Sequence, residues 1–338
     1  MHEVSGPKQP EPLLWSCWTP MPVEPEIAIV TSIPPRVNRE QDGRNIGMQY
    51  QSDCVASWVA AGFKILSVNL PAEIEVLAQR YPEIEFVPVE RDAGAIAGRP
   101  TPLIEDLLLT LERQPQSIVG MVNADVCMEM GKSWMEAIRD QVRSTIVIGH
   151  RLDLNSWSTQ AGELVASGVP YTGGFDLFFF EKSAIRKCIG SAGGDRPFSI
   201  GMPWWDFWLP VSLALQGHRV TRLEAPVAGH LIHPIKYDPA VWEYMGAQMV
   251  EYVHEQAKAA GVIAPELLPM IARAEELAPR AEKEIRSWTR DRALSDRGDK
   301  WSSRYKTNLE LFCGQTLRTL RDGVGLGESR RRIAGAAE

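Results

Sequence analysis

Short apolar runs alternate with segments of helical periodicity along most of the chain. Residues 27–31 (IAIVT) form one such run, and the two prolines that follow it predict a buried strand that ends in a loop. Further strands are predicted at 64–70, 85–89, 117–122, 173–181, 218–223 and 226–232, the last two around a turn. Helices are predicted between them, at 46–59, 72–80, 101–113, 183–190 and 204–216.

This alternation favours right-handed βαβ crossovers and therefore a mostly parallel sheet flanked by helices, which is the α/β fold class. Ligands of such sheets bind beyond the carboxyl ends of the strands, so the loops at those ends are expected to hold the chemistry. From residue 239 the chain becomes rich in Ala, Glu, Lys, Arg and Leu. That composition predicts a helical C-terminal appendage, with helices at about 240–260, 265–290 and 303–322.

We therefore divide the chain into four parts. Residues 1–25 form a proline-rich segment, 26–238 an α/β domain, 239–325 a helical region, and 326–338 a tail that is expected to be disordered. The C-terminal helices could form the interface of a homo-oligomer or cover the cleft. Arginines near the end of the chain could make peripheral contact with an anionic membrane surface, although a solvated tail is the plainer interpretation.

Composition and charge narrow the class of protein. With 44% hydrophobic residues among 338, the chain can form a substantial core. Its formal charge of −7 argues against nucleic acid as a partner, because binding to phosphate backbones needs many Lys and Arg. The five cysteines lie far apart without a CxxC pair, so no disulfide framework is predicted and a reducing, cytoplasmic location is expected. Neither a transmembrane helix nor a signal peptide is predicted.

The tripeptide Asn123-Ala124-Asp125 directly follows the apolar run 117–122, where the chain leaves the predicted sheet at its functional edge. A carboxylate there can hold Mg²⁺ or Mn²⁺, and such a cation would neutralise the charge of a departing diphosphate. Asn or Asp after a strand is also ordinary turn chemistry, so the tripeptide alone leaves both interpretations open.

Together with four other segments, this tripeptide resembles the motifs of the GT-A glycosyltransferases, whose metal-binding Asp-x-Asp follows a strand in the same way. IVTSIPP, GGFDLFFFE, PWWDFWLP and HLIHP are similar to further segments of that family, in the same order, over about residues 26–238. The resemblance implies a GT-A-like, Rossmann-related mixed sheet. It also implies the transfer of a sugar from a nucleotide-diphosphate-sugar donor to a hydroxyl acceptor, a carbohydrate or another alcohol, with help from Mn²⁺ or Mg²⁺. Asn123 departs from the usual first aspartate.

The resemblance also suggests which residues meet the donor. It assigns Thr31, Ser32 and Ile33 to the base and ribose, and Asp92 to the nucleoside. Arg99 lies in a segment with two arginines and two glycines, which suits a mobile loop beside an anionic phosphate. Such a segment is equally typical of a solvated connection between elements.

For the metal site, the resemblance implies Asp125 together with a histidine of the late segment, with Asn123 beside the donor. His230 and His233 both occur in that segment, and His233 is the better candidate. A histidine near the end of a strand is more often a hydrogen-bonded structural residue than a ligand, so the residue type alone does not decide its role.

Asp206 stands among Trp204, Trp205 and Trp208, whose aromatic faces would suit an acceptor sugar. A partly desolvated carboxylate has a raised pKa and could take the proton of an attacking hydroxyl, which would give an inverting transferase. If Asp206 only positions the acceptor, retention is open as well. The alternative is structural, with Asp206 as a helix N-cap and the tryptophans in the core.

Asp176 falls within a predicted apolar strand, where an unpaired charge would be costly, so it should meet Arg151 or open into the cleft and bind hydroxyls. Two carboxylates, Asp176 and Asp206, could also serve a glycoside hydrolase that needs neither nucleotide nor metal. A third alternative is a non-catalytic scaffold that keeps a GT-A-like domain. The motifs of dinucleotide-binding folds, P-loop NTPases, serine hydrolases and zinc proteases do not occur.

Overall fold

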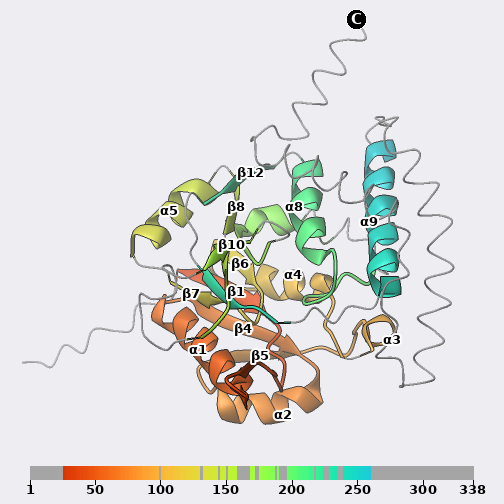
Figure 1. Ribbon diagram of the computed structural model, residues 1–338. Coiled ribbons are helices and arrows are strands. Elements are labelled where there is room, and N and C mark those ends of the chain that lie inside the picture. The colour runs from red at the N-terminus through yellow and green to blue at the C-terminus, as the bar shows by residue number, and fades with distance from the viewer. Residues whose placement is uncertain are drawn as a thin grey trace, which may run out of the picture.

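The computed structural model describes residues 26–98, 100–129, 132–143, 145–149, 151–157, 168–171, 175–186, 189, 196–216, 218–223, 228–233 and 239–259. At its centre lies a seven-stranded sheet in the order β12-β8-β11-β6-β1-β4-β5 (Figure 1). In chain order its strands are β1 (Ile27–Thr31), β4 (Lys64–Asn69), β5 (Glu85–Pro88), β6 (Ile118–Val122), β8 (Thr145–Gly149), β11 (Leu177–Glu181) and β12 (Arg219–Arg222).

Six of these strands run in one direction, and only β11 is reversed, being antiparallel to both β6 and β8. The carboxyl ends of β1, β4, β5, β6, β8 and β12 therefore meet at one edge of the sheet, and β11 begins there. This arrangement confirms the prediction of a mixed, mostly parallel sheet flanked by helices.

The sheet is covered on both faces because successive residues of its strands point to opposite sides. In β1, Ile27 and Ile29 join a core with the helices α1 (Gly47–Ala60), α2 (Pro71–Arg80) and α5 (Lys132–Val142). Ala28 and Val30 join a second core with α4 (Ile104–Glu112), α8 (Trp205–Leu215) and α9 (Pro239–Ala259). A four-residue helix, α3 (Gly94–Ala97), follows β5, and a 3₁₀ turn, η1 (Lys182–Ala184), follows β11.

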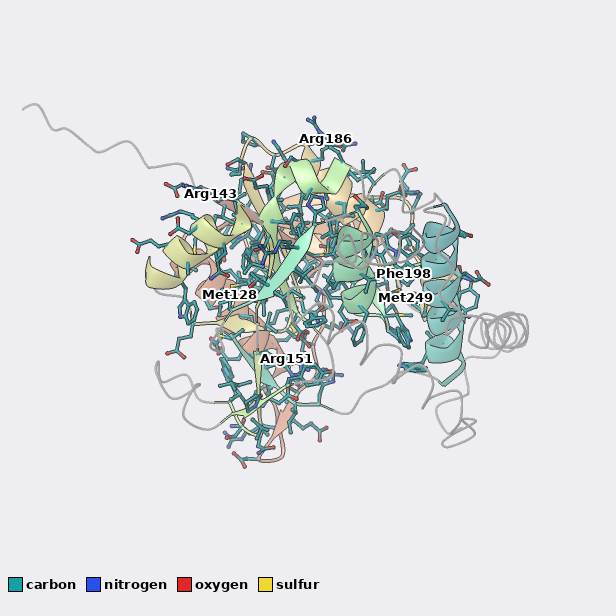
Figure 2. The ribbon with its side chains drawn as sticks, turned by 90° about the horizontal axis from the view of Figure 1, so that it is seen from above. Met128, Arg143, Arg151, Arg186, Phe198 and Met249 are labelled. Carbon is teal, nitrogen blue, oxygen red and sulfur yellow. The ribbon has the colours of Figure 1, made fainter. Side chains whose placement is uncertain are left out.

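The helix α9 stands beside α8 (Figure 1), and Phe198 and Met249 lie between the two helices (Figure 2). This is the described part of the predicted C-terminal appendage. The segment 1–25, the predicted helices at 265–290 and 303–322, and the tail 326–338 lie outside the described residues. Within the described part, no helix is both long enough and apolar enough to cross a membrane.

A second sheet of four short strands lies against the carboxyl edge, in the order β10 (Val169–Pro170), β9 (Arg151–Leu154), β13 (Ala228–Leu231) and β7 (Cys127–Met128). The strands predicted at 218–223 and 226–232 are both present, as β12 and β13, but they belong to different sheets, because β12 pairs with β8 and β13 pairs with β9 and β7. A local apolar pattern marks each strand but carries no information about its partner.

A two-stranded hairpin of β2 (Glu40–Gln41) and β3 (Arg44–Asn45) precedes α1. Asp42 and Gly43 between them have φ values of 51° and 72°, the left-handed backbone that a two-residue hairpin turn requires. Asp-Gly is the usual sequence signal for such a turn, and the sequence prediction omits it.

Candidate active site

Three side chains that can bind a metal converge at the carboxyl edge of the large sheet. Asp125 follows β6, His230 lies in β13 and His233 follows β13; one potential ligand atom of each lies within 4.8 Å of the others. The two segments are joined through Tyr50, whose hydroxyl donates to the Asp125 carbonyl at 2.6 Å and accepts from the Leu231 amide at 2.9 Å. The predicted pair of Asp125 and His233 is therefore brought together, and His230 joins it.

The distances in this cluster suit a cation better than direct hydrogen bonds. His230 Nε2 lies 3.3 Å and His233 Nε2 3.5 Å from Asp125 Oδ2, whereas a hydrogen bond to a carboxylate is usually about 2.8 Å. With metal–ligand bonds of about 2.1 Å, neighbouring ligand atoms stand about 3.0 Å apart in an octahedron and about 3.4 Å apart in a tetrahedron. The separations of Asp125 from each histidine are thus those of neighbouring ligands of a metal ion.

The second nitrogen of His230 faces another carboxylate. His230 Nδ1 lies 3.2 Å from Asp153 Oδ1, across the β9–β13 pair in which these two residues are direct partners. A carboxylate at Nδ1 fixes the orientation of the ring and turns Nε2 toward Asp125, which is how metal-binding histidines are commonly supported. Asp153 was not predicted, because its place beside His230 depends on strand pairing between distant segments.

The charges of the cluster shift the pKa values of its members. Burial alone would raise the pKa of Asp125, but His230, His233 and Arg39 hold it well below its ordinary value. Burial alone would lower the pKa of His230, yet the carboxylates of Asp125 and Asp153 raise it. Asp125 is therefore ionised at neutral pH, as a metal ligand must be.

A second polar group lies where β11 begins. Asp176 precedes β11 instead of lying within it, so the predicted strand at 173–181 starts too early; residues 172–174 are not among those described. Asp176 Oδ1 accepts bonds from Arg151 Nη1 at 2.7 Å and from Asn123 Nδ2 at 2.5 Å. Only 5% of its side chain is exposed. Arg151, rather than open cleft, is thus its main neighbour, and burial raises the pKa of Asp176.

Arg151 links this group to the metal cluster. Its guanidinium bonds to Asp176 and, at 3.0 Å, to Asp153 Oδ1, and it lies over the ring of Tyr171 at 3.9 Å from the centroid. Figure 2 labels Arg151 in the small sheet. A single arginine therefore holds two carboxylates and an aromatic ring at the edge where the metal ligands meet.

Asp206 reaches the polar group around Asp176 from the helix α8. It lies in the first turn of α8, which begins at Trp205, so the alternative of an N-cap is wrong. Its Oδ2 accepts a hydrogen bond from the Phe175 amide at 3.1 Å, next to Asp176. Removal from water is the main cause that raises the pKa of Asp206 to about 7, with a smaller effect from the Asp176 carboxylate. A carboxyl group with this pKa can exchange a proton at neutral pH.

The neighbouring tryptophans do not form a sugar platform. Trp204, Trp205 and Trp208 are 4%, 2% and 1% exposed, and all three belong to the core under α8. The expectation of exposed rings around Asp206 is wrong, because α8 turns its apolar side into the core, and Phe207 is the aromatic residue of this segment that stays half-buried.

The loop after β1 is held by hydrogen bonds to side chains of the neighbouring strand β4. The Ile33 amide donates to Ser67 Oγ at 2.9 Å, and Asn69 Nδ2 donates to the Ile33 carbonyl at 2.9 Å. Thr31 and Ile33 are fully buried, while Ser32 is half-buried. Contacts of this loop with a nucleotide would therefore be made by Ser32 and by backbone groups.

The remaining predicted donor residues lie after β5. Asp92 is exposed and its carboxylate accepts the Gly94 amide at 2.5 Å, which places it before α3. Arg99 is not among the described residues. Arg91, the other arginine of this loop, bonds to Glu105 and Asp106 of α4. A nucleoside contact of Asp92 stays a prediction.

No protein-family model and no curated protein matches the chain. Among solved structures, S. aureus TarS 1-349 matches with 11% identity over 78% of this chain and 90% of that chain, at a TM-score of 0.41. A putative nucleotide-diphospho-sugar transferase from Desulfovibrio desulfuricans G20 has 10% identity, coverage of 76% and 98%, and a TM-score of 0.37. A 4-diphosphocytidyl-2C-methyl-D-erythritol synthase matches with 10% identity over 62% of this chain and 94% of that chain, at a TM-score of 0.36. These values are too low to carry any activity over to this chain.

Proposed function

We propose that this protein is a glycosyltransferase that moves a sugar from a nucleotide-diphosphate-sugar donor to a hydroxyl acceptor with the help of a divalent cation. The observation that carries the proposal is the convergence of Asp125, His230 and His233 at the carboxyl edge of a parallel sheet. That edge is where α/β folds bind nucleotides. Asp206, whose pKa is raised to about 7, stands near the same edge and is available for proton transfer.

The ligand atoms suggest which cation is used. Two imidazoles and one carboxylate favour a transition metal such as Mn²⁺ over Mg²⁺, which prefers oxygen ligands throughout. When bound, the cation supplies charge that stabilises the departing diphosphate. The protein is proposed to work in the cytoplasm, where thiols such as the free Cys54 and Cys127 stay reduced.

The protein's own residues would divide the remaining work. Asp206 takes the proton of the acceptor hydroxyl while the acceptor oxygen bonds to the anomeric carbon of the donor sugar. At the same time the bond between that carbon and the diphosphate oxygen breaks, and its electron pair leaves with the diphosphate. This displacement inverts the anomeric carbon. Asp176 holds Arg151 beside the metal ligands through their ion pair, and Ser32 with the loop backbone receives the nucleoside.

The proposal is tested by binding, before any acceptor is known. Thermal unfolding is followed with UDP, GDP, ADP, CDP and dTDP and their common sugar conjugates, each with Mn²⁺, with Mg²⁺ and with no metal. One nucleotide should raise the melting temperature by mass action, more with Mn²⁺ than with Mg²⁺. The response to metal should disappear in Asp125→Ala, while Glu75→Ala, at an exposed position on α2, serves as a control for the loss of a carboxylate.

Three results would count against the proposal. If no nucleotide changes the melting temperature, the transferase is abandoned in favour of a scaffold or a hydrolase. If nucleoside triphosphates and a sugar phosphate yield pyrophosphate, the chain is a nucleotidyltransferase instead. Hydrolysis of a simple glycoside without nucleotide or metal would establish the hydrolase.

A further inference from the structure

The candidate metal site already contains a cation that the chain itself supplies. Arg39 Nη2 lies 2.7 Å from Asp125 Oδ2, the same oxygen that faces both histidines. Only 10% of the Arg39 side chain is exposed, so this ion pair is largely shielded from water, where opposite charges attract more strongly than at the surface. The carboxylate proposed to bind the metal is thus neutralised by an arginine.

The position of Arg39 is fixed by the hairpin that follows it. Its amide donates to Asn45 Oδ1 at 3.1 Å, and its carbonyl accepts from the Ile46 amide at 2.7 Å. Gln41, two residues later, bonds through its side chain to both the amide and the carbonyl of Trp157. A backbone held at both polar groups presents its side chain from a defined point, so the contact with Asp125 is a built feature of the fold.

The guanidinium has binding capacity left over. Nη1 donates to the Asn38 carbonyl at 3.0 Å and Nη2 to Asp125. Nε is buried and has no hydrogen-bond partner among the described residues. A buried donor without an acceptor costs free energy, so the guanidinium is not fully satisfied by its protein partners. If a metal ion took Asp125 Oδ2, Nη2 would also lose its acceptor, and a phosphate oxygen beside the metal would replace it.

We propose that Arg39 serves two anions in turn. It neutralises Asp125 while the site holds no metal, and it binds the diphosphate of the donor once a divalent cation has taken Asp125. This inference rests on the proposed function. A divalent cation added to the ion pair leaves an excess of positive charge around Arg39, and a diphosphate is the part of the donor that offsets it. Metal and donor should therefore each bind weakly alone and strongly together.

The test compares Arg39→Gln with the intact protein. Calorimetric titration with Mn²⁺ alone should show about tenfold tighter binding in Arg39→Gln, because Asp125 no longer has to give up a partner. In saturating Mn²⁺, the nucleoside diphosphate of the panel that binds the intact protein should bind Arg39→Gln at least about tenfold more weakly. The exposed Arg36, in the same loop, gives the control Arg36→Gln, for which neither value should change.

A second variant covers the event that Arg39→Gln does not fold. Arg39→Lys keeps the charge but lacks the planar fork, so Mn²⁺ alone should bind as in the intact protein while the diphosphate binds more weakly. If Mn²⁺ and diphosphate bind the intact protein, but binding is unchanged in Arg39→Gln, or in Arg39→Lys where only that variant folds, the role of Arg39 is refuted and the proposed function stands. If the intact protein binds neither, both are refuted.

Discussion

At the scale of single residues, the chemistry of the site depends on how carboxyl groups are shielded from water. Asp176 and Asp206 both have raised pKa values, chiefly because they are removed from water, whereas the surrounding positive groups keep Asp125 ionised. Carboxyl groups in one region thus hold different protonation states at neutral pH, which allows one to bind a metal while another exchanges a proton.

The raised pKa of Asp206 should make the stability of the folded protein depend on pH. Its pKa in the folded protein, about 7, lies above the ordinary value of 3.8. The protonated form of Asp206 is favoured in the folded protein, so its contribution to the free energy of unfolding is fully present below pH 3.8. That contribution is lost as the pH rises from 3.8 to 7. Asp206→Asn cannot ionise and should not lose this contribution. The melting temperature of the variant should therefore exceed that of the intact protein by an amount that grows from pH 3.8 to pH 7 and then stays constant. The difference in the free energy of unfolding should reach at most about 4 kcal/mol. An advantage that is independent of pH would contradict the raised pKa.

The residues of the site were partly accessible from sequence. Asp125 was predicted because it directly follows a strand, and that position is visible in a linear pattern. Arg39 and Asp153 were missed because each reaches the site only through contacts between distant segments: Arg39 and Asp125 lie 86 residues apart. A signal for Arg39 did exist, since the Asp-Gly turn after it predicts a hairpin beside the first loop of the sheet.

At the scale of elements, the segment before the hairpin and the start of α1 approach each other too closely for a side chain at residue 47. A Cβ added to Gly47 would lie 2.0 Å from the carbonyl oxygen of Val37. Glycine at this position therefore lets the segment that carries Arg39 pack against the start of α1.

Gly47→Ala should consequently lower the free energy of unfolding by roughly 3 kcal/mol, because backbone atoms would have to move. Gly43→Ala, in the hairpin turn that precedes α1, is the matched control. No atom of the described residues lies within 4 Å of its added Cβ, so only the positive φ of 72° opposes it, at about 1 kcal/mol. Urea unfolding of both variants measures the difference, and equal losses would refute the close approach.

The prediction of elements succeeded for several uniformly apolar runs and failed at a strand whose polar residues face the site. The strands β1, β4 and β6 were expected within one residue of their observed bounds. The strand β9, with Arg151 and Asp153 pointing into the site, has no apolar pattern of that kind and was omitted. The strand β8 was omitted as well, although its residues TIVIG form an apolar run. At β9, the polar side chains that face the site interrupt the apolar pattern by which a strand is predicted.

At the scale of the whole molecule, α9 packs as part of the α/β core. Met245, Met249 and Tyr252 are buried in the same cluster as the residues of α8. Trp204, which precedes α8 with a φ of 73°, donates through its ring nitrogen to the Trp242 carbonyl at 3.1 Å. The turn that presents Asp206 is therefore supported by a helix beyond the predicted boundary at 238.

A chain shortened to residues 1–238 should accordingly fail to fold. Each large apolar side chain of α9 removed from the core costs about 1.5–3 kcal/mol, and several together exceed the total stability of a typical domain, about 5–15 kcal/mol. Circular dichroism during heating should show no cooperative transition for the short form. A transition at the temperature of the full chain would show that 26–238 is an independent domain.

The reversed strand β11 has a consequence for the order of folding. Within the described sheet it alone joins β6 to β8, so without it β5-β4-β1-β6 and β8-β12 would be separate ribbons. The first ribbon comes from one continuous stretch of chain, with local crossovers that form quickly, whereas β8, β11 and β12 must assemble together. A partly open form of the protein would thus keep the loop for the nucleoside and lose the edge that carries Asp176. Amide protons of β8 and β12 should then exchange with solvent as one cooperative unit.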